Sequence, residues 1–308
     1  MNSRQKEYLN YTLEQEKEII SELKEVYNKA LNDINQKIAI LLGREDTENL
    51  QSIIYQVDYQ KAIKKQINAI LDVLHSEEYE KIQEYLMKSY ENGYLGTMYD
   101  LQGQGIPLII PIDQEKVLEA LTVDSKLSKS LYESLGEDIK VLKNKVRTNI
   151  SRGIASGLSY QDIATNISNT SKIGINNAIR IARTEAGRIQ NQASFDAQTK
   201  AKEKGADVVK QWDATLDSRT RTSHRILDGQ IRELDEPFEY KGYKAMHPHG
   251  FGVPRLDINC RCALLQRAKW GLDEEELEEL KKKASYFKLD KTKSFEDFKI
   301  KYLENISK

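Results

Sequence analysis

Residues 212–229 read WDATLDSRTRTSHRILDG, and residues 247–262 read HPHGFGVPRLDINCRC. The stretch from Trp212 to Cys262 contains three of the four histidines, both cysteines and three of the five prolines of the chain. Side chains able to bind ligands and residues with special backbone geometry are therefore concentrated in it. We expect this stretch to form the functional site, with helices elsewhere leading up to it.

His224, Cys260 and Cys262 are candidate metal ligands. Two thiolates with an imidazole suit Zn²⁺ in a tetrahedral site. A single residue separates the cysteines, which is tighter than the usual C-x-x-C spacing. The alternative is that both cysteines are small buried thiols on one face of a strand, with the histidine bonded to a carbonyl. A disulfide between them is disfavoured, because one intervening residue strains the bridge and an intracellular chain is kept reduced.

The segment from Asp217 to Gly229 predicts a turn or a capped short helix. Its serine, threonine and aspartate side chains can bond nearby backbone groups, and Asp228-Gly229 is a turn pair whose glycine accepts positive φ. The guanidinium groups of Arg219 and Arg221 can form forked hydrogen bonds to carboxylates or phosphates. A catalytic interpretation makes His224 a general acid or base that Asp228 orients. The spacing indicates no nucleophile, so a structural polar network is favoured.

Four ordered features together resemble the Mu F-like phage minor head protein family, also called phage head morphogenesis proteins. They are ARTEAGRIQN at residues 182–191, the W-D-A-T-L-D-S-R-T-R-x-x-H-x-x-L-D-G segment from Trp212, the region around Phe238, and N-C-R-C at residues 259–262. The family's last motif usually reads H-P-N-C-R-C, whereas Asp257-Ile258 precede Asn259 here. The positions that match the family are Arg183, Glu185, Arg188, Trp212, Asp217, Arg219, His224, Asp228, Gly229, Asn259, Cys260 and Cys262.

The resemblance implies a minor component of a phage or prophage capsid that acts by docking rather than as an enzyme. Its expected partner is the portal protein, with the scaffold or major capsid protein and packaged DNA as further candidates. It would assist procapsid assembly, DNA packaging or ejection. Its expected location is the virion, at the capsid interior or portal vertex, after assembly in the host bacterial cytoplasm.

Two other functions stay open from the residues. One is a zinc-dependent hydrolase or nuclease that uses His224 with Cys260 and Cys262. The other is a DNA-binding accessory factor that uses Arg180, Arg183 and Arg188. Residues 145–225 carry fourteen Lys or Arg against seven Asp or Glu, so a local basic surface is expected there. A solvated face explains the same charges equally well, because they form no dense run.

Composition excludes a membrane protein. Charged residues make up 31% of the chain, and the mean hydropathy is -0.65. No apolar run approaches the roughly 20 residues that span a bilayer, and the first residues lack a hydrophobic signal core. The net charge of -1 gives no sign of a nucleic-acid binder from the bulk balance.

The expected fold class is α+β and predominantly α-helical, with a long N-terminal helical region before a small α+β domain that holds a short β-sheet. The 308 residues allow two domains, or one domain with a helical extension. We expect a helical hairpin or bundle at 1–91, a connector with short helices at 92–136, a Mu F-like domain at 137–272 and a helical tail at 273–308.

Apolar residues at alternating steps of three and four predict two long helices at the start. One seam runs from Leu13 to Leu41 and the next from Ile53 to Leu74, so an antiparallel hairpin is expected. The second helix is predicted to end at His75-Ser76, and a third to cover residues 77–90. Residues 92–111 hold four glycines and two prolines, which predict a hinge before a short strand or buried elbow.

The later elements are predicted from the same kinds of signal. Helices are expected at residues 113–121, 125–135 and 137–154, then one opened by Ser159 as a cap, and one from Ile175 to about Lys204 with a face of small residues. Strands are expected at residues 208–212, in a hairpin arm at residues 238–243, and at residues 259–265.

Overall fold

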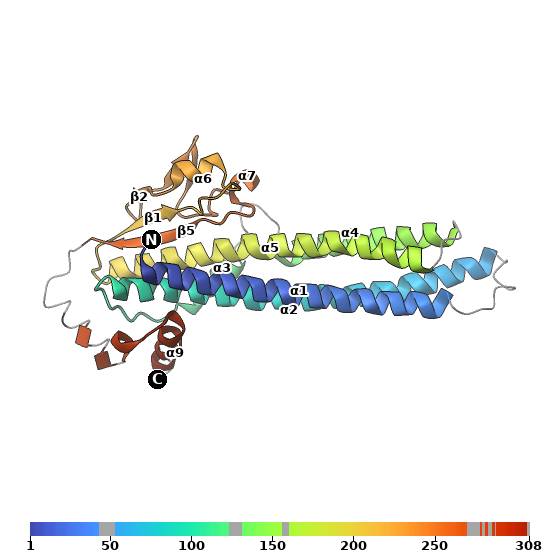
Figure 1. The fold of residues 1–308 in the computed structure, drawn as a ribbon, viewed down its shortest axis with the longest axis horizontal. Coiled ribbons are helices and arrows are strands. Elements are labelled where there is room, and N and C mark those ends of the chain that lie inside the picture. The colour runs from blue at the N-terminus through green and yellow to red at the C-terminus, as the bar shows by residue number, and fades with distance from the viewer. Residues whose placement is uncertain are drawn as a thin grey trace. The chain divides into compact units, whose positions relative to one another are not determined.

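The computed structural model describes residues 1–42, 53–122, 131–155, 160–269 and 288–306, together with 278, 281–282 and 285–286 (Figure 1). The chain is a predominantly helical α+β protein, as predicted. The helices are α1 Ser3–Leu42, α2 Ile53–Gly103, α3 Gln114–Thr122, α4 Leu131–Ala155, α5 Tyr160–Glu203, α6 Thr222–Leu227, α7 Pro254–Asp257, α9 Phe295–Ile306 and the 3-10 helix η1 Leu289–Lys291. The strands are β1 Val208–Asp213, β2 Ile231–Arg232, β3 Phe238–Tyr240, β4 Tyr243–Ala245 and β5 Ala263–Ala268.

The chain divides into two compact units. Unit 1 comprises residues 1–16, 84–128 and 182–308, and unit 2 comprises residues 17–83 and 129–181. The helices α1, α2 and α5 each contribute residues to both units. The domain borders expected from the sequence stay a prediction.

Unit 2 is a helical bundle with an apolar core. The predicted seams supply part of it, because Leu23, Tyr27, Ile34, Ile67 and Leu74 are buried. The predicted helix end at His75-Ser76 is wrong, since α2 continues through both residues. Neither residue is a glycine or proline, and the buried stripe continues at helical spacing. That stripe is Leu71, Leu74, Glu78, Ile82 and Leu86.

Two glycines in the predicted hinge lie inside α2 instead, where neighbouring chain segments approach closely. A Cβ on Gly93 would overlap the carbonyl oxygen of Gln190 in α5, and a Cβ on Gly96 would overlap the Tyr8 ring in α1. A glycine thus permits tight helix packing here rather than breaking the helix. The helix ends only at Gly103.

Residues 104–113 form the buried elbow that was one of the two expected alternatives. The backbone N–H of Ile110 donates to the Tyr302 hydroxyl at 2.7 Å, and that hydroxyl donates to the Ile110 carbonyl at 2.7 Å. Tyr302 belongs to α9, which is further attached by the Phe295 N–H to Glu7 and by Lys299 to Asn92. In Figure 1, α9 lies on the opposite side of α1 and α2 from the sheet.

The helix predicted from Ile175 is the second part of α5, which begins at Tyr160. Its small-residue face is buried in unit 1, through Ala182, Ala186, Ala193 and Ala197. The break predicted between a helix ending at residue 135 and one starting at residue 137 is wrong, because the single helix α4 runs through Gly136. The proposed cap Ser159 and residues 125–130 lie outside the described residues.

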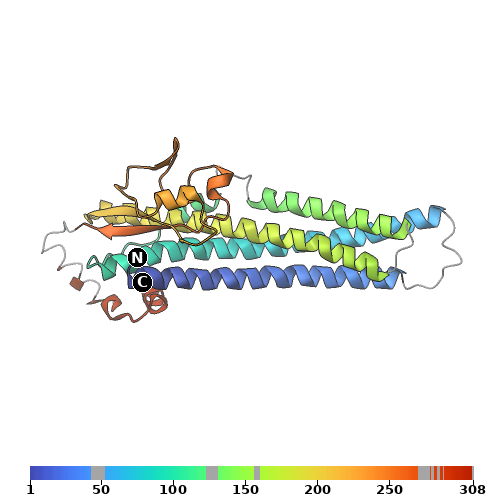
Figure 2. The same ribbon diagram turned by 45° about the horizontal axis from the view of Figure 1, so that its top comes forward.

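Unit 1 contains two small antiparallel sheets. One has the strand order β2-β1-β5, and its longest register pairs Val208 with Ala268 and Asp213 with Ala263. The other is the β3-β4 hairpin. Both views show the larger sheet lying beside the end of α5 (Figure 2). The strand predicted at 208–212 and the predicted hairpin arm are confirmed.

The strand predicted to start at Asn259 begins only at Ala263. Asn259 has φ 53°, in the left-handed region, which an extended strand cannot contain. Cys260 and Cys262 therefore lie in the loop before β5 rather than on a strand face. Among the described residues, no helix is both long and apolar enough to cross a membrane.

Candidate functional site

The site is a buried trio of His224, Cys260 and Cys262. The His224 Nδ1 atom lies 3.1 Å from Cys262 Sγ and 3.5 Å from Cys260 Sγ. The Cys262 N–H points to Cys260 Sγ at 3.4 Å. His224 is only 3% exposed, Cys260 8% and Cys262 6%. Residues separated by about 36 positions in the chain are thus brought together at one point.

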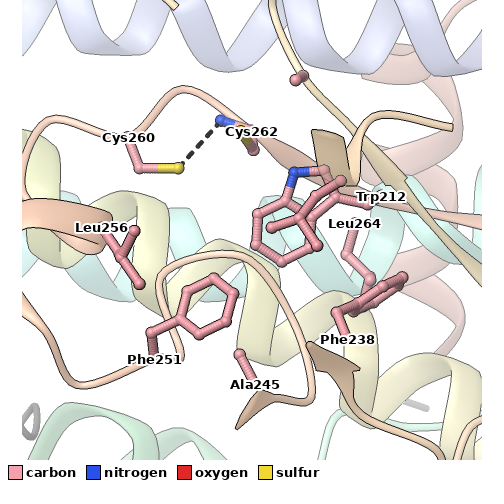
Figure 3. Packing of buried hydrophobic residues seen from close by; sticks show 10 residues of the cluster. Trp212, Phe238, Ala245, Phe251, Leu256, Cys260, Cys262 and Leu264 are labelled. Atoms are coloured by element: carbon pink, nitrogen blue, oxygen red, sulfur yellow. Dashed lines mark hydrogen bonds between the residues drawn. The ribbon is translucent and has the colours of Figure 1, made fainter. Parts of the chain in front are cut away.

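Aromatic packing surrounds the trio, and Figure 3 shows the apolar cluster that contains the two cysteines and Trp212. Trp212, at the end of β1, is fully buried and its ring lies 6.1 Å from that of His224 at 75°. Phe238 and Phe251 pack on the same indole at 5.2 Å and 5.7 Å between ring centroids. Cys260 and Cys262 complete this apolar cluster beside Leu256. A tryptophan at this position therefore fixes both α6 and the cysteine loop.

A buried aspartate shapes the loop that leads to the cysteines. The Asp257 carboxylate accepts the N–H groups of Phe251, Gly252 and Val253 at 3.4, 2.7 and 3.2 Å. Burial raises the pKa of Asp257, and these three backbone donors act in the opposite direction. In the sequence, Asp257 stands out only as a departure from the family motif. Its position just after Gly252-Val253-Pro254 was the available signal for a side chain that ties a turn.

Arg221 closes the same loop from the other side. Its guanidinium donates to the carbonyl oxygens of Leu256 and Ile258. Arg221 comes directly before α6, so this contact joins the helix that carries His224 to the segment that carries Cys260. Sequence reasoning considered this arginine as a ligand for anions, whereas here its partners are backbone carbonyls.

The ARTEAGRIQN run in α5 is hydrogen-bonded to the backbone of the cysteine loop. Thr184 Oγ1 accepts the Asn259 N–H at 3.2 Å. The Asn191 amide donates to the Cys262 carbonyl at 3.2 Å and accepts the Leu264 N–H at 2.6 Å. Because Asn191 bonds both sides of the chain there, it sets the point at which β5 begins.

Glu185 and Arg188 lie three residues apart on α5 and form an ion pair, with 2.9 Å between Arg188 Nε and Glu185 Oε2. Both side chains are largely buried. Arg188 also donates to the Ala120 carbonyl at 2.9 Å, at the end of α3. The pair therefore attaches α5 to α3 rather than to the Trp212–Cys262 stretch.

Asp217 and Arg261 form a two-point ion pair on the outer side of the cysteine loop. The Arg261 nitrogens lie 2.6 and 2.7 Å from the two Asp217 oxygens. This contact, together with the Arg219 N–H and the Thr220 hydroxyl, holds the pKa of Asp217 well below its usual range. The Arg219 side chain itself is 80% exposed, 3.7 Å from Asp217.

Asp228 and Gly229 form the predicted turn. Gly229 has φ 75°, and its N–H donates to the Trp212 carbonyl at 2.8 Å. Asp228 Oδ1 accepts the Ala214 N–H at 2.8 Å. Asp228 therefore bonds the backbone next to β1, and the orienting contact to His224 that the catalytic interpretation expects is not formed.

The other two histidines of the stretch pack against α5. His247 Nε2 lies 2.9 Å from the Gln192 side-chain oxygen, and its Nδ1 lies 2.8 Å from the Pro248 carbonyl. His249 adopts φ 66°, and its ring lies where a Cβ on Gly187 would be. Burial, together with neighbouring His247, lowers the pKa of His249 to about 3. The glycine in ARTEAGR thus leaves room for an imidazole.

The two cysteines differ in acidity. Burial raises the pKa of Cys260, and its contact with Cys262 adds to that rise. Contact with Cys260 and then with His224 lowers the pKa of Cys262, against the opposing effect of burial. One sulfur thus favours the thiolate, which is the form that binds metals.

The three arginines named for DNA binding have different surroundings. Arg180 is exposed. Arg183 pairs with Glu16 at 2.6 Å, and Arg188 is occupied by Glu185 and the Ala120 carbonyl. Their contact with DNA stays a prediction; Arg180 and Arg183 are exposed, whereas the Arg188 side chain is largely buried.

Comparison with known proteins identifies relatives. Residues 144–265 match the family described as "Phage Mu protein F like protein". The chain is 27% identical to minor head protein GP7 of Bacillus phage SPP1 over 261 residues, which are 82% of this chain and 77% of that protein. It is 35% identical over 276 residues to a protein of Enterococcus faecalis named NAD(+)–arginine ADP-ribosyltransferase EFV.

The second similarity covers 86% of this chain, which spans about half, 55%, of that relative's length. No solved structure matches the chain. The matched residues 144–265 include the buried trio, Trp212 and the α5 residues that support the cysteine loop. This match identifies a Mu F-like domain at residues 144–265, and the similarity to GP7 over most of the chain supports a phage minor head protein.

Proposed function

We propose that this protein is a minor head component that docks at the portal vertex and assists procapsid assembly, DNA packaging or ejection. The observation that carries the proposal is the extent of the similarity to minor head protein GP7. It covers 82% of this chain and 77% of that protein, which is more than the Mu F-like residues 144–265 alone. The helices and the small domain are therefore proposed to work together in the virion, with the portal protein as first partner and the scaffold or major capsid protein as further ones.

The contacts of the motif residues support docking rather than turnover. Trp212, Asp217, Asp228 and Asn259 bond or pack within the domain. The trio is almost completely buried, so a substrate as large as a nucleic acid has no direct approach to His224. Internal contacts of this kind hold the domain in one shape, which a docking surface requires.

The name of the Enterococcus relative describes an enzyme, but a transferase rather than a hydrolase or nuclease. This chain spans 55% of that protein, and the name describes the whole of it. The zinc hydrolase or nuclease hypothesis also requires an accessible histidine and a partner that orients it. His224 is 3% exposed and Asp228 bonds the Ala214 backbone, which favours the docking hypothesis.

The segment between Ala214 and Gly229 offers apolar side chains to a partner. Leu216 and Ile226 are 64% and 54% exposed, although both are large and apolar. Arg225 donates to the Asp217 carbonyl at 2.8 Å, so α6 is tied to the turn before it. We propose this segment, with exposed Arg219 beside it, as the first place to seek the portal contact.

The test is co-expression of the chain with the portal protein of the same genome, followed by affinity purification through the portal protein. Co-purification is expected. A Leu216→Asp, Ile226→Asp double variant should lose most of it, whereas Ile300→Asp, at an exposed position of α9, should not. Circular dichroism controls for folding.

Absence of co-purification by the folded wild-type chain would contradict the portal assignment. Metal-dependent cleavage of DNA by the purified chain, abolished by His224→Gln, would establish the nuclease hypothesis instead. DNA binding is tested separately by its salt dependence, which is steep for phosphate contacts.

A further inference from the structure

We propose that His224, Cys260 and Cys262 bind a Zn²⁺ ion that joins α6 to the loop before β5. The site would be structural, and it does not depend on the docking partner. Neither the family match nor the named relatives describe a metal. The proposal rests on the geometry of three side chains that converge from separate elements.

The distances fit a tetrahedral site. With Zn–S of about 2.3 Å and Zn–N of about 2.0 Å, tetrahedral geometry separates a sulfur and a nitrogen ligand by about 3.5 Å. The observed separations from His224 Nδ1 are 3.5 Å to Cys260 Sγ and 3.1 Å to Cys262 Sγ. All three ligand atoms lie within 4.8 Å of one another. The two nitrogen–sulfur separations therefore lie within about 0.4 Å of those in a tetrahedral zinc site.

The charges also fit. A Zn²⁺ ion with two thiolates and a neutral imidazole carries no net charge, so burying the complete site avoids the large cost of an isolated buried charge. The Cys262 N–H, 3.4 Å from Cys260 Sγ, lies where a backbone donor supports a metal-bound thiolate. Without a cation, a thiolate here would sit in an apolar cluster beside Trp212 and Leu256.

Simple core packing explains the trio less well. Within the described part of the chain, His224 Nδ1 has the two sulfur atoms as its hydrogen-bonding neighbours, and buried Nε2 has no partner. A histidine satisfied by a carbonyl, the alternative expected from the sequence, is therefore not what the structure places here. Two weak contacts to sulfur offset little of the free-energy cost of burying an imidazole.

The ion would have a mechanical role. His224 lies in the short helix α6, which has six residues and no side-chain cap. A helix of this length has little stability of its own. A metal bond to the cysteine loop would hold α6, and with it the exposed segment that precedes it, in one arrangement. Three protein ligands leave one tetrahedral position for water or another donor.

The experiment measures metal on the full chain, purified with a tag that lacks histidine. Zinc by mass spectrometry should be close to one ion per chain. Cys262→Ser and His224→Gln should lose it, and His75→Gln, in unit 2, should retain it. Cobalt substitution supplies a second readout on the wild-type chain, because Co²⁺ bound to thiolates shows an intense sulfur-to-metal charge-transfer band. That band should disappear in Cys262→Ser.

A folded wild-type chain that binds neither zinc nor cobalt would overturn the proposal. So would equal zinc content in wild type and both ligand variants, because the metal would then lie elsewhere. Intact-mass analysis of the unreduced chain tests the remaining alternative. A loss of two hydrogens, which reduction restores, would identify a Cys260–Cys262 disulfide and also overturn the site.

Discussion

Glu78 in unit 2 provides a direct test of how a buried carboxyl affects stability. It lies on the apolar stripe of α2 and is almost fully buried. One carboxyl oxygen accepts the Tyr27 hydroxyl at 3.2 Å, and the other has no partner among the described residues. Burial raises the pKa of Glu78 to about 8, although the Tyr27 contact acts against this rise. The folded protein therefore keeps this carboxyl protonated at pH values where the unfolded chain ionises it.

The sign and size of the effect follow from proton linkage. The folded state binds more protons than the unfolded state between the two pKa values, so stability falls as the pH rises through that window. The window runs from the ordinary glutamate value of 4.5 to about 8. Between about pH 5 and about pH 7 this one group should cost about 2 kcal/mol of unfolding free energy. The variant Glu78→Gln keeps an acceptor for Tyr27 and cannot ionise, so it should lose that part of the pH dependence.

The assay is urea unfolding followed by circular dichroism at both pH values, with hydrogen exchange of α2 peptides to report on unit 2 itself. Glu80→Gln is the matched control, because Glu80 is an exposed carboxyl two residues further along the same helix. The control should keep the wild-type slope of stability against pH. If Glu78→Gln also keeps the wild-type slope, the pKa of Glu78 is not raised in the folded protein, and the linkage reasoning is refuted.

Three further substitutions test the packing of unit 1, and Gly136→Ala in unit 2 is the contrast to the first of them. Gly93→Ala should destabilise the protein by about 1–3 kcal/mol, because its methyl group meets the Gln190 carbonyl; Gly136→Ala, with His75 no closer than 3.6 Å, should instead raise the melting temperature. Asp257→Ala should cost about 2 kcal/mol by leaving three backbone N–H groups unpaired, and unchanged proteolysis at residues 250–262 would argue against that role. Asn191→Ala should speed hydrogen exchange of the Leu264 amide, because that N–H loses its acceptor on α5. An amide that stays protected would show that the β1–β5 pairing is enough to protect it.

Much of this protein was predictable from local sequence signals. Strand β1, the Asp228-Gly229 turn and the helical character of the first part follow from residue type and spacing. The choice of His224, Cys260 and Cys262 as one candidate set followed from ligand chemistry. The family was recognisable because its motifs occur in order along the chain.

The continuity of α2 and the shape of the cysteine loop were decided by tertiary structure. Gly93 indicates a break when read alone, yet it is the residue that lets α5 pack on α2. Asn259 indicates a strand by its neighbours, yet Asn191 and Thr184 hold this segment in a left-handed turn. Local propensity differences are worth about 1 kcal/mol, and several buried hydrogen bonds together exceed that. Sequence patterns therefore determine which elements form, and contacts between distant segments determine where each element ends and what its polar side chains bind.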